Sequence, residues 1–166
     1  MIVSVSIHHS LIDLISDELL EQLHSVGHLK QCHDGQMIHA QADKSIGLSI
    51  ILDGRVRFGL YTKDGTFYLT GILCPGHCYG EVTLFADRPR AYHAEAFGEP
   101  EILVIGQSAF DALYDRESAF ARAVTQTITQ RLYESLDFAD DLRRVPIEGR
   151  IARLLLRTAR IGGFDD

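Results

Sequence analysis

The sequence predicts a mainly β fold with flanking helices, in which a sandwich, roll or barrel of short strands is followed by a long C-terminal helix. Turn signals recur through the first two thirds of the chain at intervals of roughly 10 to 12 residues, as in all-β rolls and barrels. After residue 106, by contrast, neither glycine nor proline occurs until Pro146, which favours helix. A length of 166 residues, with 46% apolar and 23% charged residues, fits one folded domain plus a fragment.

A short helical segment is expected near the N-terminus. Residues 10–25 place leucine and isoleucine at helical spacing, and Ser16 or Asp17 is a candidate cap inside this run. The apolar positions are Leu11, Leu14, Ile15, Leu19, Leu20 and Leu23.

Short β-prone runs follow, separated by the turn signals. Residues 49–52 and 55–61 flank Asp53-Gly54, a pair that predicts a tight hairpin because both positions adopt positive φ readily. Within the second run, apolar residues alternate with polar or small ones, so one face of that strand is expected to be buried. Further strands are expected over residues 66–73, 92–96 and 102–105.

The segment after residue 106 predicts a short helix and then a long one. Ser108 and Asp111 form a helix-start signal, and Pro146 and Gly149 are expected to end the long helix before another begins at Ile151. Steps of three and four residues form a narrow stripe that is typical of a dimer seam, although packing on the helix's own domain would use the same pattern. The stripe consists of Ala121, Val124, Ile128, Leu132, Ser135, Ala139 and Leu142.

Charge and cysteine content indicate a cytoplasmic protein whose body does not grip nucleic acid. The net charge is −7, divided into −10 for residues 1–142 and +3 for residues 143–166. Three cysteines without zinc-type spacing suit a reducing compartment. The start lacks a basic signal region, and the longest uncharged stretch, residues 65–80, is broken by glycine and proline, so no membrane partner is expected.

Residues 76–91 carry the pattern that predicts function. Gly80 lets the backbone approach a ligand closely, and a helix turn starting near Glu81 would aim free N–H groups at an anion. Arg90 follows a turn that folds it back toward those groups, and its guanidinium suits a phosphate. The Glu81 carboxylate suits a sugar hydroxyl, so the pattern indicates a nucleotide. The alternative is that Glu81 and Arg90 simply pair with each other.

This stretch resembles the phosphate-binding cassette of cyclic nucleotide-binding domains, which has a Gly-Glu pair, a short apolar helix and an Arg-Ala pair at this separation. The surrounding chain resembles the bacterial Crp/Fnr transcriptional regulators. That likeness extends from the first helix through residues 52–56, the Pro75-Gly76 pair and the long helix to residues 148–152.

The resemblance implies a role for each matching residue. Gly80, Glu81 and Ala91 would supply backbone N–H groups to the cyclic phosphate, and Arg90 its counter-charge. The Glu81 carboxylate would bind the ribose 2′-hydroxyl, and Ser135 the adenine amino group, although Ser135 is equally well explained as a small seam residue. Ala91 lacks the hydroxyl that is often found after the arginine. In related kinase domains, the absence of this hydroxyl goes with cyclic AMP rather than cyclic GMP.

The resemblance also implies a double-stranded β-helix of the jelly-roll or β-roll kind followed by a long C-terminal dimerisation helix, with three regions and a regulatory role. Residues 1–106 would form the N-terminal helical segment and effector-binding β-roll, residues 107–145 the dimerisation helices, and residues 146–166 the start of a truncated DNA-binding domain. The effector would be cyclic AMP. The partners would be a second copy, DNA through an absent helix-turn-helix, and RNA polymerase in the full-length protein. No enzyme activity, catalytic residue or metal site is expected.

Two alternatives remain. Some Crp/Fnr relatives sense gas or redox state through haem, and His77 or Cys74 is a candidate axial ligand. A cupin-type metalloenzyme would use His77 and Glu81 with His39 and His93, but the His-x-His pair that usually starts this metal set is absent.

Overall fold

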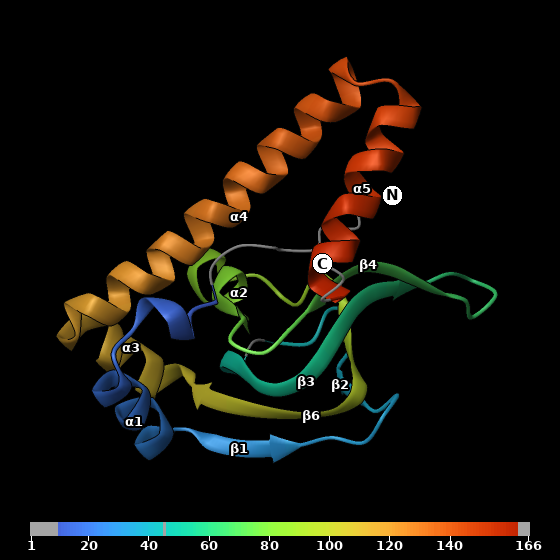
Figure 1. Cartoon of the computed structure of the whole chain (residues 1–166). Coiled ribbons are helices and arrows are strands. Elements are labelled where there is room, and N and C mark those ends of the chain that lie inside the picture. Colours follow the sequence, from blue (N-terminus) through green and yellow to red (C-terminus); the bar gives the residue numbers. More distant parts are fainter. Residues whose placement is uncertain (1–9, 45, 163–166) are drawn as a thin grey trace.

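The computed structural model describes residues 10–44 and 46–162 (Figure 1). Its elements, in chain order, are η1 (Ile12–Leu14), α1 (Asp17–Val26), β1 (His28–Gln31), β2 (Met37–His39), β3 (Gly47–Tyr61), β4 (Phe67–Leu73), β5 (Cys78–Tyr79), α2 (Glu81–Ala86), β6 (His93–Gly106), α3 (Gln107–Arg116), α4 (Ser118–Arg144) and α5 (Ile147–Gly162). The strands form one six-stranded sheet in which β1, β6, β3 and β4 are neighbours in that order, β2 pairs with β6, and β5 pairs with β3. All the pairings are antiparallel, so the mainly β prediction is confirmed.

The predicted N-terminal helical segment is confirmed, but it consists of two helices. The 3₁₀ turn η1 ends at Leu14, and the extended backbone of Ile15 follows it and separates it from α1. The Ser16 side chain then accepts a hydrogen bond from the Leu19 backbone N–H at 3.3 Å and caps α1. Since an N-cap hydroxyl satisfies one of the orphan donors of the first turn, the break inside the apolar run is explained by Ser16.

Two hydrophobic clusters use opposite faces of the same strands. The first joins the helices to the sheet and includes Leu23 of α1, Ile50 of β3, Phe110 of α3 and Phe120 of α4. The second lies inside the roll and includes Ile51, Val56, Tyr79, Ala94, Ala96 and Ile102. Because successive strand residues point to opposite faces, the neighbours Ile50 and Ile51 serve different clusters.

The predicted hairpin at Asp53-Gly54 is wrong. Residues 47–61 form a single 15-residue strand, and the hairpin to β4 comes later, at Asp64-Gly65. The pairing of β3 with the equally continuous β6 shifts register around Asp53, which pairs with Glu101, so residues 98–100 lie opposite Gly54. Gly54 has φ +70°, and a Cβ there would lie 2.6 Å from the Pro100 Cα. A glycine signal in a strand can therefore serve a bulge as well as a turn.

The long C-terminal helices also differ from expectation in detail. Helix α3 begins at Gln107, so Ser108 lies inside it, and an extended Glu117 separates α3 from α4. Helix α4 ends before Pro146 as predicted, but α5 begins at Ile147 and includes Gly149. Figure 1 shows α5 turning back from the end of α4 toward the sheet. Within the described residues, no helix is long and apolar enough to span a bilayer.

The predicted stripe on α4 divides into two parts. Val124 is fully buried in the first hydrophobic cluster and Ile128 packs against it, so this part of the stripe contacts the chain's own domain. Leu132 and Leu142 of the stripe are 57% and 48% exposed, and Leu136, which is outside the predicted stripe, is 55% exposed. The intramolecular alternative therefore holds for the first half of α4, and only the second half presents a free apolar face.

Candidate functional site

The site is built around the corner between β5 and α2. Strand β5 pairs with residues Ser49 and Ile50 of β3, which fixes the corner to the sheet. Gly80 has φ +105°, and a Cβ there would lie 2.5 Å from the Gly47 carbonyl oxygen and 2.8 Å from Arg90 Nη1. Glycine is required here because both the backbone conformation and the close packing exclude a side chain.

Arg90 lies against this corner, where Ala42 anchors its backbone. The Ala42 N–H donates to the Arg90 carbonyl at 2.8 Å, and the Arg90 N–H donates to the Asp43 carbonyl at 2.9 Å. The Arg90 side chain donates from Nη2 to the Gly47 carbonyl at 3.4 Å, and its guanidinium lies 5.9 Å from the Tyr79 ring centroid.

Arg90 is a buried cation. It is 6% exposed, and burial lowers the pKa of its guanidinium. None of the ion pairs among the described residues involves Arg90. An arginine that is buried without a carboxylate partner is costly to the fold, so this position is suited to receive an anion.

Glu81 pairs with a residue from the long helix. Its carboxylate is 2% exposed, and Oε1 accepts a hydrogen bond from Arg131 Nη1 in a buried ion pair. Arg131 Nη2 also donates to the Cys78 carbonyl at 2.5 Å. Burial has the largest single effect on the pKa of Arg131 and lowers it, but the charge and hydrogen bond of Glu81, together with Cys78 and Glu134, outweigh burial and the pKa is raised. The alternative that Glu81 simply pairs with Arg90 is therefore wrong.

Arg131 was not among the residues expected at this site. A sequence signal was nevertheless present, since Arg131 precedes Ser135 by one helical turn and such residues share a helix face. The Ser135 hydroxyl donates to the Arg131 carbonyl at 2.8 Å. Glu81 Oε2, in contrast, is buried without a hydrogen-bond partner in the described part of the chain.

A cavity of about 380 Å³ lies between the Gly80 corner and α4. Its size falls in the ~300–1,000 Å³ range of small-molecule sites. Gly80, Glu81 and Ser135 line it together with Arg131, and the Arg90 guanidinium packs directly behind Gly80. Its other lining residues are Phe58, Thr70, Gly71, Leu73, Tyr79, Val82 and Tyr92. Ala91 is exposed and precedes Tyr92 at the rim.

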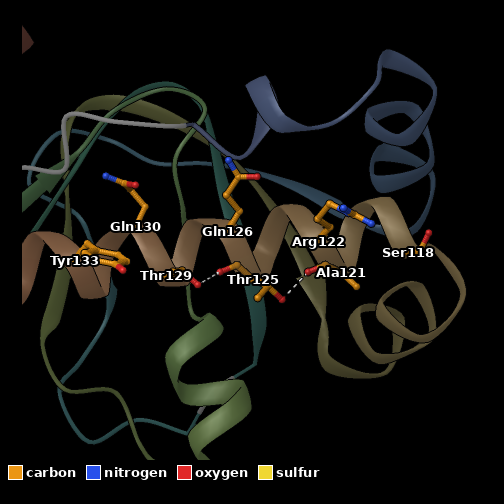
Figure 2. A pocket seen from close by; sticks show the side chains of 8 residues that line it. All are labelled: Ser118, Ala121, Arg122, Thr125, Gln126, Thr129, Gln130 and Tyr133. Atoms are coloured by element: carbon orange, nitrogen blue, oxygen red, sulfur yellow. Dashed lines mark hydrogen bonds between the residues drawn. The ribbon is translucent and has the colours of Figure 1, made fainter.

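A groove of about 570 Å³ along α4 has a different character (Figure 2). All the side chains that line it come from one face of a single helix. The hydroxyls of Thr125 and Thr129 donate to backbone carbonyls one turn back, each at 2.8 Å. These two hydroxyls are therefore used within the helix, and the groove is a feature of one helix surface, whereas the 380 Å³ cavity is lined by several elements.

The alternative haem ligands lie outside the 380 Å³ cavity. His77 is 9% exposed, and its Nδ1 accepts a hydrogen bond from the Cys74 backbone N–H at 3.0 Å. Burial lowers the pKa of His77 and raises that of the Cys74 thiol. These contacts are those of a residue that stabilises the turn between β4 and β5. Across the described ranges, no three His, Cys, Asp or Glu residues gather in a way that would hold a metal ion.

The fold and the cavity define a class of protein, a β-roll domain with a candidate ligand cavity between a glycine corner and a long helix. The chain belongs to the cyclic nucleotide-binding domain family, whose model matches residues 29–117, and it is of the Crp/Fnr type.

Similar proteins support this assignment. The chain is 25% identical over 132 residues to the CRP-like cAMP-activated global transcriptional regulator of Mycobacterium tuberculosis, which covers 80% of this chain and 59% of that regulator. It is 27% identical over 107 residues to lysophospholipase NTE1 of Coccidioides immitis, covering 64% of this chain but 7% of that enzyme. The Thermus thermophilus catabolite activator protein superposes with a TM-score of 0.71 at 24% identity, covering 81% of this chain and 63% of that one.

Proposed function

We propose that this chain is the effector-binding region of a transcriptional regulator, that it binds a cyclic nucleotide, and that cyclic AMP is the favoured effector. The observation that carries the proposal is Arg90, a buried guanidinium that makes no ion pair with a carboxylate among the described residues. A cyclic phosphate beside Gly80 would supply the missing negative charge. Backbone N–H groups of Gly80, Glu81 and Ala91 would complete the phosphate site.

The neighbouring carboxylate fits the ribose of such a ligand. Arg131 holds Glu81 Oε1, which leaves Oε2 buried and unpaired at the cavity. A ribose 2′-hydroxyl would donate to Oε2 and satisfy this acceptor. Because an unsatisfied buried acceptor costs about 1–3 kcal/mol, the hydroxyl contact adds to affinity.

The helix side of the cavity favours adenine over guanine. The Ser135 hydroxyl proton is already donated to the Arg131 carbonyl, so the oxygen offers only acceptor lone pairs to a ligand. The adenine amino group is a donor that matches them. The guanine base has a carbonyl at the corresponding position, which would face these lone pairs unfavourably.

Arg131 suggests how binding would reach the rest of the protein. It joins the cassette to α4 through Glu81 and the Cys78 carbonyl, so a ligand that shifts Glu81 also shifts the helix. The exposed apolar face from Leu132 to Leu142 would form the homodimer contact. A ligand changes the equilibrium only by its differential affinity for the two states.

The remaining regulatory assignments follow from the family. Residues 1–106 would form the sensor, residues 107–145 the dimerisation helices and residues 146–166 the start of a DNA-binding module. In the whole regulator, DNA and RNA polymerase would be the partners and the cytoplasm the compartment. The role is ligand sensing rather than catalysis, and we assign no catalytic residue.

Isothermal titration calorimetry with cyclic AMP and cyclic GMP tests the proposal. We expect wild-type protein to bind cyclic AMP more tightly, and Arg90→Ala to lose at least about tenfold in affinity, since each charge-assisted bond contributes about 1.5–3 kcal/mol. Arg88→Ala is the matched control, because Arg88 lies in the same segment but is exposed. Absence of binding by the wild type, or equal binding by wild type and Arg90→Ala, would contradict the proposal.

A further inference from the structure

His39 lies one layer behind the anion site. It ends β2, and its ring packs against two aromatic rings of the cavity wall. The ring centroids of His39 and Phe58 are 6.2 Å apart, and those of His39 and Tyr79 are 5.8 Å apart. The guanidinium of Arg90 lies over the same Tyr79 ring. His39 and Arg90 therefore share one aromatic neighbour at the phosphate end of the site.

The His39 ring has an unsatisfied nitrogen. Nδ1 is buried and has no hydrogen-bond partner in the described part of the chain. Most buried polar atoms in folded proteins are hydrogen-bonded, so an exception beside a ligand cavity calls for a functional explanation.

Burial and the surrounding charges keep the His39 ring neutral. Burial is the main cause, and together with Arg90 it lowers the pKa of His39 to about 4. Lys30 and His93 add to this effect, and Asp43 opposes it. At neutral pH the ligand-free protein therefore holds an uncharged imidazole next to a buried guanidinium.

We propose that His39 is a second cation of the anion site, one that takes up a proton from solvent when an anionic phosphate binds beside Arg90. The inference rests on the proposed function and adds a residue to it. The phosphate would cancel the repulsion that Arg90 exerts on a protonated imidazole. The unpaired Nδ1 would become an N–H donor within the site, and the charged ring would in turn strengthen phosphate binding.

The sign of the effect follows from linkage. Binding raises the pKa of His39 from its ligand-free value of about 4, but burial persists and keeps it below the usual 6.5. The ligand-bound state therefore binds more protons between these limits, and affinity rises as the pH falls. We expect the dissociation constant for cyclic AMP to fall about two- to fourfold between pH 7 and pH 5.

Two measurements on the full chain test this inference. Nuclear magnetic resonance titration of the His39 Cε1–H signal, with and without saturating cyclic AMP, should show a higher pKa in the complex. Calorimetry near pH 5.5 in two buffers of different ionisation enthalpy should show net proton uptake by the wild type. His39→Phe keeps an aromatic ring in place and should abolish the uptake, whereas His28→Gln, at an exposed position of β1, should not.

The outcomes separate this inference from the proposed function. Failure of cyclic AMP to bind at any pH contradicts the proposed function, whereas binding without a change in His39 overturns only the inference. Equal proton uptake by the wild type and His39→Phe overturns it as well. If His39→Phe does not fold, ligand-free Arg90→Gln provides the second test, because removing the guanidinium should raise the pKa of His39 and an unchanged value refutes the coupling.

Discussion

The candidate site has an arginine toward each of its two ends, Arg131 in the cavity wall and Arg90 packed behind Gly80, and the two side chains have different surroundings. Arg131, at the helix end, forms an ion pair with the buried carboxylate of Glu81 and also donates to a backbone carbonyl. Arg90, at the phosphate end, donates to the Gly47 carbonyl and takes part in none of the ion pairs of the described chain. The comparison teaches that Arg131 completes an ion pair within the fold, whereas Arg90 is the cation that our proposal assigns to the phosphate of the ligand.

The largest expected effect comes from breaking the helix end. Arg131→Met leaves Glu81 buried without its cation, and losing one partner of a buried pair typically costs about 3–5 kcal/mol. We expect the free energy of unfolding in urea to fall by about this amount. Arg122→Met, at another position on α4, is the control and should change it little. If Arg131→Met were as stable as the wild type, the ion pair between Glu81 and Arg131 would not be what holds residues 80–91 to α4.

The phosphate end should respond in the opposite way. Arg90→Met replaces a buried cation that lacks a carboxylate partner with an apolar side chain of similar length. We expect the ligand-free protein to keep its stability or gain up to about 1–2 kcal/mol, because no uncompensated charge is left behind. Urea unfolding of the ligand-free variant gives the measurement, and a loss like that of Arg131→Met would show that Arg90 is also a structural residue.

Removing a hydroxyl tests the base end of the cavity. Ser135→Ala deletes the acceptor that we assign to the adenine amino group, and a single hydrogen bond contributes about 1 kcal/mol. We expect about a fivefold weaker affinity for cyclic AMP and little change for cyclic GMP, measured by calorimetry. Ser118→Ala, at the start of the same helix, is the control. Equal losses for both nucleotides would contradict the role of Ser135 in selectivity.

The last prediction concerns stability in acid. Because the pKa of His39 is about 4 in the folded protein and near 6.5 when unfolded, the unfolded chain binds more protons between these values. The contribution of His39 to the free energy of unfolding is present above pH 6.5 and is lost as the pH falls toward 4. Urea midpoints at pH 7 and pH 5 should therefore differ less in His39→Phe than in the wild type, and an equal difference would show that His39 titrates normally.

Local features of the site were predictable from the sequence. Gly80, Glu81 and Arg90 lie within one short segment, so their types and spacing are enough to indicate an anion site. The role of Gly54 was not predictable in this way. The positive φ of Gly54 was predictable. The choice between a hairpin and a bulge was not, because it depends on Pro100, which packs against Gly54 from β6.

The α4 stripe illustrates a second limit. Its spacing identifies an apolar face but not what covers it, since a seam between copies and a contact with the same chain use the same periodicity. Burial resolved the question differently for Val124 and Leu132, which lie on one helix. The first packs into the domain core, and the second lies beyond the edge of that core.

The sequence alone determined the mainly β fold, the long helices and the phosphate cassette, because each depends on residues close together in the chain. Only the tertiary structure decided that Glu81 pairs with Arg131, a residue 50 positions away, and that Arg90 takes part in none of the ion pairs of the described chain. Ion pairing depends on distance and burial in three dimensions, and local spacing contains neither quantity.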